Sequence, residues 1–174
     1  MKMSYWRFLA MVATSSVVML AFMYLNTYAL DHVRWSETRG YMTLLMAAAM
    51  AVVMLSFMLP MYTSKGANAA IYIGSVVLFA GALWLVRSQS TVDDSSYMRA
   101  MIPHHSIAIL TSERAQIHDV RVRELADEII RAQRREISEM EWLIRDIAQN
   151  GVAETQAEAA ARPLPDFKGR LKPQ

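Results

Sequence analysis

The decisive stretch of this sequence is an uncharged run of 25 residues at positions 40–64, GYMTLLMAAAMAVVMLSFMLPMYTS. Two similar runs flank it, one of 23 residues from Phe8 to Leu30 and one of 21 residues from Gly66 to Val86. A helix needs roughly 18–20 apolar residues to cross the hydrocarbon core of a bilayer. The sequence therefore predicts three transmembrane helices, at about 8–30, 41–62 and 67–86, in a membrane domain of residues 1–92 whose partner is the lipid bilayer.

Lysines and arginines near the ends of the runs do not decide the orientation in the membrane. Three lie on each side: Lys2, Arg7 and Lys65 against Arg34, Arg39 and Arg87. Three spans place the N-terminus and the C-terminal half on opposite sides, and N-terminal positive charges slightly favour an outward C-terminal domain. The first run exceeds the 7–15 apolar residues of a signal peptide, so we expect it to remain as a span.

The loop between the first two runs is polar and carries His32 beside Asp31. A single loop histidine is typically solvated, and we expect that of His32. Tyr28 and Trp35 are placed as aromatic residues at a membrane interface often are. No Asp, Glu, Lys, Arg or His lies inside the three runs, so the sequence offers no machinery for proton-coupled transport.

Cysteine is absent from the 174 residues, whereas methionine occurs 14 times. This excludes disulfides, thiolate nucleophiles and thiolate zinc sites, so a bound metal must use histidine, carboxylate or methionine sulfur. The sequence contains no nucleophile–base constellation, phosphate loop or dinucleotide motif. We therefore expect a protein that is not an enzyme, and no nucleic-acid partner.

The composition changes at Asp93, where charged residues become frequent. An apolar stripe from Met98 to Ser112 predicts an amphipathic helix that ends near His118. Asp119 is a suitable N-cap for a second helix, which Gly151 ends and whose stripe includes Val122, Leu125, Ile129, Ile137 and Ile144. The sequence thus predicts an all-α chain, with an antiparallel helical hairpin at 93–150 and a flexible tail at 151–174.

A single hairpin buries its two apolar stripes poorly. It must dock on the membrane helices or pair with a second copy, and two hairpins would make a four-helix bundle, of which this chain supplies half. We therefore expect a homodimer.

Polar residues interrupt both stripes. On a helical wheel His105 lies at the centre of the buried face of the first helix, with His104 on its flank. On the second helix Gln133, Glu136 and Met140 share the apolar side. A carboxylate there is costly unless it is paired, hydrogen-bonded or bound to a cation.

Folding the hairpin about residues 118 and 119 brings these residues together. Met101 then faces Glu136, His104 faces Gln133, and Met98 lies near Met140. Imidazole suits copper, zinc and iron, whereas thioether sulfur selects soft ions such as Cu(I) or Ag(I). Two plainer interpretations stay open: methionines that only fill the core, and a histidine–glutamate pair that is only structural.

These residues also carry a resemblance. The stretch YMRAMIPHHSIA (97–108), followed by VRELA (122–126) and IIRAQRREISEMEWL (129–143), resembles the bacterial family known as domain of unknown function 305. The family motifs are Met-x-x-Met-Ile-x-His-His and Gln-x-x-Glu-Ile-x-x-Met, and the match covers about residues 93–149. The resemblance implies a ferritin-like helical fold, usually exported, with members linked to copper binding and resistance. Carried over, the metal-site candidates are Met98, Met101, His104, His105 and Met140, with Gln133 and Glu136 as ligands or partners of those ligands.

The preferred hypothesis is a multi-pass protein of the bacterial inner membrane. Its periplasmic hairpin binds a metal ion, with Cu(I) favoured, for storage, sensing or delivery. One alternative is a structural or assembly subunit whose polar core only sets helix register. A ferritin-like metal-dependent oxidase ranks lower, because such sites use several carboxylates and Glu-x-x-His pairs.

Methionines also recur every fourth residue from Met42 to Met58 in the second predicted span. The favoured interpretation is that these methionines face lipid or pack against other helices. The alternative is that they form a path or a docking face for a soft cation.

Overall fold

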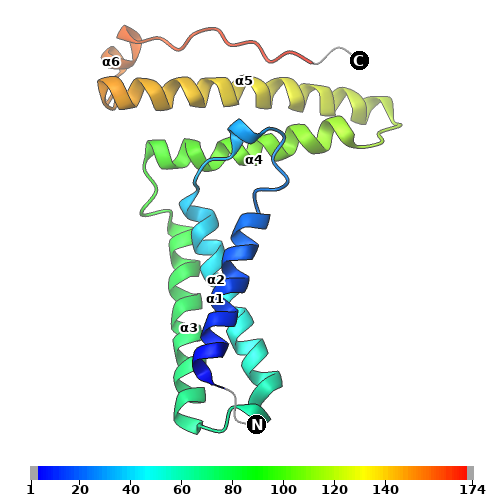
Figure 1. Ribbon diagram of the computed structural model, residues 1–174. Helices are drawn as coiled ribbons and strands as arrows, with labels where there is room; N and C mark the ends of the chain where they lie inside the picture. The colour runs from blue at the N-terminus through cyan, green and yellow to red at the C-terminus, as the bar shows by residue number, and fades with distance from the viewer. Residues whose placement is uncertain (1–3, 172–174) are drawn as a thin grey trace. The chain divides into compact units, whose positions relative to one another are not determined.

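The computed structural model describes residues 4–171, all in helices and connecting segments, with no strand in that range. This confirms the all-α fold class. Residues 1–3 and 172–174, the outer ends of the predicted membrane domain and tail, lie outside the description, and with them Lys2. The elements are α1 Tyr5–Phe22, η1 Leu30–His32, α2 Glu37–Met58, η2 Leu59–Met61, α3 Lys65–Ser88, α4 Asp94–Arg114, α5 Val120–Asn150 and α6 Gln156–Ala161, where η marks a 3-10 turn (Figure 1).

The chain divides into two compact units. The first, here called the span unit, comprises the chain up to residue 25 and residues 37–92. The second, the hairpin unit, comprises residues 26–36 and the chain from residue 93 onward. The loop 26–36 lies inside the predicted membrane domain of residues 1–92, yet its contacts are with the hairpin.

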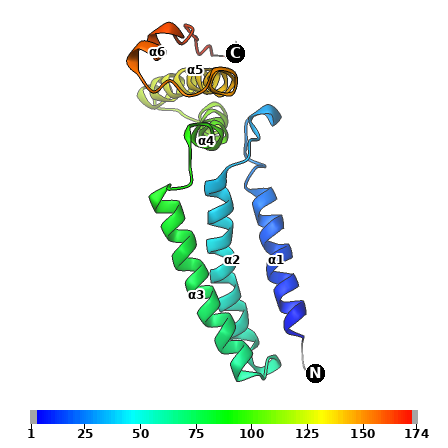
Figure 2. The same cartoon turned by 90° about the vertical axis from the view of Figure 1, so that its left-hand side faces the viewer.

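Three helices of the span unit are long and apolar enough to cross a membrane. They cover Tyr5–Phe22, Glu37–Met61 and Lys65–Ser88, with 18, 25 and 24 residues. The side chains of Phe8, Leu55 and Tyr62 are almost fully buried in a small core that joins α1 to α2. Figure 2 shows α2 running beside α3, and those two helices pack along their length.

The ends of the spans differ from the predicted ones for local reasons. Pro60 lacks an amide proton, so α2 gives way to the 3-10 turn η2 near the predicted end at residue 62. Helix α3 begins at Lys65, because the Ser64 side chain accepts a hydrogen bond from the Ala67 amide. Helix α1 ends at Phe22, well before residue 30, since the chain then turns to join the hairpin unit.

Helices α4 and α5 form the predicted antiparallel hairpin (Figures 1 and 2). Asp93 caps α4 by accepting from the Ser96 amide at 2.7 Å, and Asp119 caps α5 by accepting from the Arg121 amide at 2.9 Å. Hydrogen bonds from the Arg121 side chain and backbone hold the pKa of the Asp119 carboxyl below its ordinary value. Helix α5 ends before Gly151, whose positive φ of 78° suits glycine.

The buried core of the hairpin unit mixes aliphatic residues with methionine: Met98, Ile102, Ile109, Ile130, Ile137 and Met140. Val122 and Leu125, expected on the buried stripe of the second helix, are 48% and 56% exposed. Helix α4 ends at Arg114 rather than near His118.

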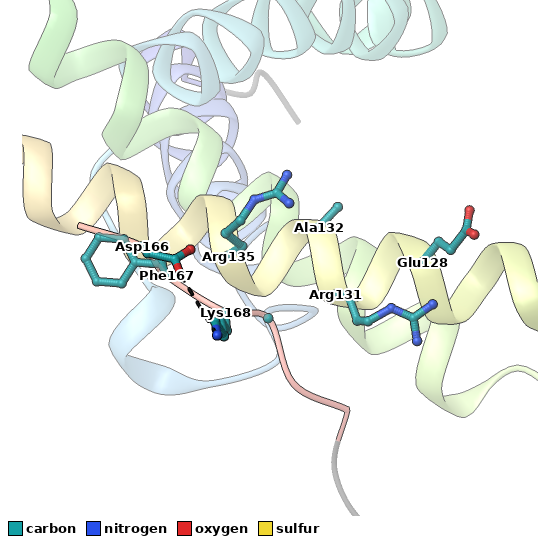
Figure 3. A pocket seen from close by; sticks show the side chains of 8 residues that line it. Glu128, Arg131, Ala132, Arg135, Asp166, Phe167 and Lys168 are labelled. Carbon is teal, nitrogen blue, oxygen red and sulfur yellow. Dashed lines mark ion pairs between the residues drawn. The ribbon is translucent and has the colours of Figure 1, made fainter. Parts of the chain in front are cut away.

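The tail continues along α5 after a short helix. A capping box formed by Thr155 and Glu158 starts α6, and Arg162 pairs with Asp146 at 2.6 Å. Gly169 passes so close to the Arg131 carbonyl that a Cβ there would collide with it. A pocket of about 540 Å³ opens between the tail and α5 (Figure 3), lined by Glu128, Arg131, Ala132, Arg135, Asp166, Phe167, Lys168 and Gly169. The flexibility of the tail stays a prediction.

Candidate functional site

An ion pair links the two helices of the hairpin. The Nε2 atom of His105 lies 2.7 Å from Oε2 of Glu136, with side chains 11% and 37% exposed. The Nδ1 atom of the same ring lies 3.0 Å from the Met101 carbonyl oxygen, one turn earlier on α4. Glu136 thus has a partner on the opposite helix, and its Oε1 atom lies 3.8 Å from Nη2 of Arg135 on its own helix.

The two acceptors around His105 fix where its protons lie. A carbonyl oxygen only accepts hydrogen bonds, so Nδ1 carries a proton and donates it to Met101. A further proton lies between Nε2 and the Glu136 carboxyl oxygen, and in the ion-pair form the imidazolium donates it. A metal ion can bind Nε2 only after that proton leaves and the bond to Glu136 opens.

The three candidate methionines lie in or against the apolar core of the hairpin. Met98 on α4 and Met140 on α5 are 6% and 9% exposed, and Met101 packs against them from the edge of the core. The hairpin therefore brings three thioether side chains from both helices into one apolar core. The ion pair between His105 and Glu136 joins the same two helices.

His104 and Gln133 lie less centrally. His104 is exposed, with its ring centroid 6.1 Å from that of His105. Gln133 is partly buried, and no side-chain hydrogen bond joins it to the other candidates in residues 4–171. That His104 faces Gln133 stays a prediction.

The partner of Glu136 is His105, whereas the register about residues 118 and 119 places Met101 opposite it. Side chains on a helix lean toward the N-terminus of that helix. In an antiparallel pair the two helices lean their side chains in opposite directions. Two side chains that touch therefore belong to residues that lie further along each helix than the two residues whose backbones are level. The hydrogen bond between His105 and Glu136 follows this direction. Sequence pairing by backbone level alone therefore selected a residue one turn too early.

The loop 26–36 packs directly behind His105. The Ser106 hydroxyl is fully buried, accepts a hydrogen bond from the Tyr28 amide at 2.7 Å, and lies 2.9 Å from Nδ1 of His32. The side chain of His32 is only 15% exposed. The expectation that His32 is solvated is therefore wrong, and the reason is a serine 74 positions away in the sequence.

Tyr28 belongs to the same contact rather than to an isolated interfacial position. Its ring packs against the hairpin core, and the Arg134 guanidinium lies 5.8 Å from the ring centroid. Arg134 also pairs with Glu113 on α4 and donates to the Arg170 carbonyl in the tail. One arginine therefore ties together α4, α5, the loop and the tail. Its mid-helix position in a polar segment offered no sequence signal for this role.

Within residues 4–171 no group of three or more His, Cys, Asp or Glu side chains is arranged to hold a metal ion. The candidates are of a different kind: a histidine paired with a glutamate, and three methionines of the hairpin core. Its donors are those that suit a soft monovalent ion, since thioether sulfur prefers Cu(I) to hard divalent cations. The pocket in Figure 3 contains none of the seven candidates.

The helices define a small all-α protein with three candidate membrane spans and a C-terminal helical hairpin. The chain belongs to the family of the "Domain of unknown function (DUF305)", whose model matches residues 94–169. It is also similar to "Uncharacterized protein L153" of Acanthamoeba polyphaga mimivirus, with 32% identity over 139 residues that cover 78% of this chain and 90% of the relative. That match is longer than the region 94–169, so it includes part of the N-terminal half. No solved structure matches.

Proposed function

We propose that this protein is a membrane-anchored copper-binding protein that takes Cu(I) as its cargo at the hairpin, in metal homeostasis or resistance. The observation that carries the proposal is that the hairpin core holds Met98, Met101 and Met140, while His105 and Glu136 pair across the same two helices. Met98, Met140 and the His105 Nε2 atom are the favoured ligands. Met101 and the exposed His104 are further donors beside them.

The chemistry of the donor set supports a soft ion. Thioether sulfur and imidazole nitrogen are both good Cu(I) ligands, and a thioether carries no proton that must be lost before it binds. Binding at His105 Nε2 requires the hydrogen bond to Glu136 to open. Glu136 then acts as the acceptor that holds His105 in place when no metal is bound, with Gln133 as its neighbour one turn earlier on α5.

A structural role for the same cluster is the second candidate. His105 already has an acceptor at each ring nitrogen, which is the arrangement of a satisfied core histidine. In that case the ion pair sets helix register and the methionines fill the core. The two candidates differ in one respect: only the first requires the methionine sulfurs.

Cu(I) titration of the purified full-length chain against a competing chelator separates them. Met98→Leu with Met140→Leu keeps core volume and removes two sulfurs, and such swaps usually cost less than about 1.5 kcal/mol of stability. We expect this double variant, and a variant with His104, His105 and Met101 all replaced, to lose at least about tenfold in affinity, equivalent to about 1.4 kcal/mol.

The matched control is Met46→Leu with Met50→Leu, which removes two methionines from α2 and should leave the affinity unchanged. Unchanged affinity in both hairpin variants would remove copper binding from this site. Loss of affinity in the α2 control instead would assign the soft-ion site to the methionines that recur from Met42 to Met58 in the second candidate span.

We further propose a multi-pass location in a bacterial inner membrane with a periplasmic hairpin. Loop 26–36 and the hairpin pack into one unit, so both must lie on the same side of any membrane that the chain crosses. Three spans satisfy this condition, because the loop follows the first span and the hairpin follows the third. The chain has no cysteine, so Lys65→Cys and Ser90→Cys each provide a single labelling site. A membrane-impermeant maleimide should label Ser90→Cys on intact spheroplasts, and Lys65→Cys only after permeabilisation.

A homodimer is the proposed assembly. Two copies of the hairpin would complete a ferritin-like four-helix bundle, and Val120, Val122 and Leu125 are exposed at the start of α5. Sedimentation in detergent should give a dimer that Leu125→Asp dissociates. A monomer at every concentration would contradict the proposal.

A further inference from the structure

Three arginines from three segments of the hairpin unit line one pocket of about 360 Å³. Arg34 comes from the loop 26–36, Arg99 from α4 and Arg145 from α5. The other lining residues are Glu141 and Ile144. The pocket therefore gathers three guanidinium groups around one carboxylate, a net charge of +2.

The single carboxylate does not neutralise the three arginines. Oε1 of Glu141 lies 3.3 Å from Nη2 of Arg34, at side-chain exposures of 28% and 45%. Neither Arg99 nor Arg145 has an ion pair within 4 Å in residues 4–171, although the cap carboxylate of Asp93 acts on Arg99 from further away. Two guanidinium groups thus face the same open pocket without a direct counter-ion, and their mutual repulsion falls when an anion binds between them.

Chain connectivity limits how far the Arg34 backbone can lie from the end of a candidate span. Arg34 lies three residues before Glu37, where the candidate span Glu37–Met61 begins. Three residues reach at most about 10–11 Å, so the Arg34 backbone cannot lie far from the end of α2. The surface of a bilayer presents lipid phosphates at this level, and basic pockets beside spans bind lipid head groups.

We propose that Arg34, Arg99 and Arg145 form a binding site for the phosphate of an anionic phospholipid. A guanidinium matches two phosphate oxygens with a planar fork of N–H donors, which an ammonium cannot do. Ile144 supplies an apolar wall beside the phosphate. The site uses no residue of the proposed copper cluster, so either proposal can fail alone.

The test uses the full-length chain in a neutral detergent, titrated with dioctanoyl phosphatidylglycerol. Dioctanoyl phosphatidylcholine, which has no net charge, and inorganic phosphate are the comparison ligands. Tryptophan fluorescence reports binding, since Trp35 and Trp142 follow Arg34 and Glu141 in the sequence. Arg99→Gln with Arg145→Gln removes two positive charges from the pocket. Arg114→Gln with Arg131→Gln removes two exposed charges elsewhere in the same unit.

We expect saturable binding of the anionic lipid that the pocket variant weakens about 30-fold, equivalent to about 2 kcal/mol, and the control variant less than about threefold. Glu141→Gln removes the only pocket carboxylate and should tighten binding at least about threefold, a gain that misfolding cannot mimic. Equal losses in both arginine pairs would mean diffuse attraction and overturn the proposal. So would inorganic phosphate binding as tightly as the lipid, equal binding of the neutral lipid, no saturable binding, or weaker binding by Glu141→Gln.

Discussion

Replacing Ser106 by alanine tests the contact between loop 26–36 and α4. The Ser106 hydroxyl is fully buried, accepts from the Tyr28 amide at 2.7 Å and lies 2.9 Å from Nδ1 of His32. Alanine fits the same space but offers no polar group. The change therefore removes two hydrogen bonds of the loop and creates no steric conflict.

The magnitude follows from the burial of these groups. A buried donor left without its acceptor costs about 1–3 kcal/mol, and an ordinary hydrogen bond contributes about 1 kcal/mol. We take about 2–3 kcal/mol as the loss for the closed loop. At 1.4 kcal/mol per factor of ten, the equilibrium for loop opening shifts by about 30–150-fold.

Hydrogen exchange measured by mass spectrometry on the full-length chain in detergent reports this opening. In Ser106→Ala the amides of residues 26–36 should exchange about 30–150-fold faster, while α5 keeps its protection. Ser112→Ala is the matched control, because Ser112 lies on the same helix and makes no side-chain hydrogen bond within residues 4–171. Unchanged exchange in Ser106→Ala, or equal acceleration in the control, would refute the assigned role of Ser106.

Three further changes test the hairpin unit. Asp119→Ala should lower the Tm at pH 7. The pKa of Asp119 is lowered in the folded chain, so the difference in Tm between the variant and the native chain should shrink once the pH falls below 3.8, the ordinary pKa of an aspartate. Arg134→Met leaves Glu113 unpaired and should lower the free energy of unfolding, measured by chemical denaturation, by about 2 kcal/mol. Adding Glu113→Leu in a double variant should restore most of this loss. Gly169→Ala should expose the tail to proteolysis without changing the Tm, since its Cβ collides with the Arg131 carbonyl.

The span unit and the hairpin could be predicted because their signals are local. An uncharged run of 25 residues is long enough to cross a bilayer as a helix, and the structure has a helix long and apolar enough to do so at this place. Likewise, Asp119 at the start of α5 and Gly151 at its end act on the backbone within one turn. Their positions in the sequence therefore gave the limits of the helix.

The contacts of loop 26–36 could not be predicted, because each depends on a partner far away in the sequence. Ser106 lies 78 positions from Tyr28, and Arg134 lies 106 positions from it. Neither serine nor arginine follows a periodic pattern that would reveal such a contact. The metal-site candidates were easier, since periodicity alone placed His105 and Met140 on facing stripes, where the structure has them buried.

The neighbouring residues His105 and Ser106 explain why the loop matters for the candidate site. Successive residues on a helix point about 100° apart, so His105 can bond to α5 while Ser106 bonds to the loop. This turn of α4 is therefore held from two directions, by Glu136 and by the segment that connects the first two candidate spans. A fragment limited to residues 93–150 would keep Glu136 but lose Tyr28 and His32. Metal binding measured on such a fragment would describe a His105 that is held from one side only. Metal binding should therefore be measured on the whole chain.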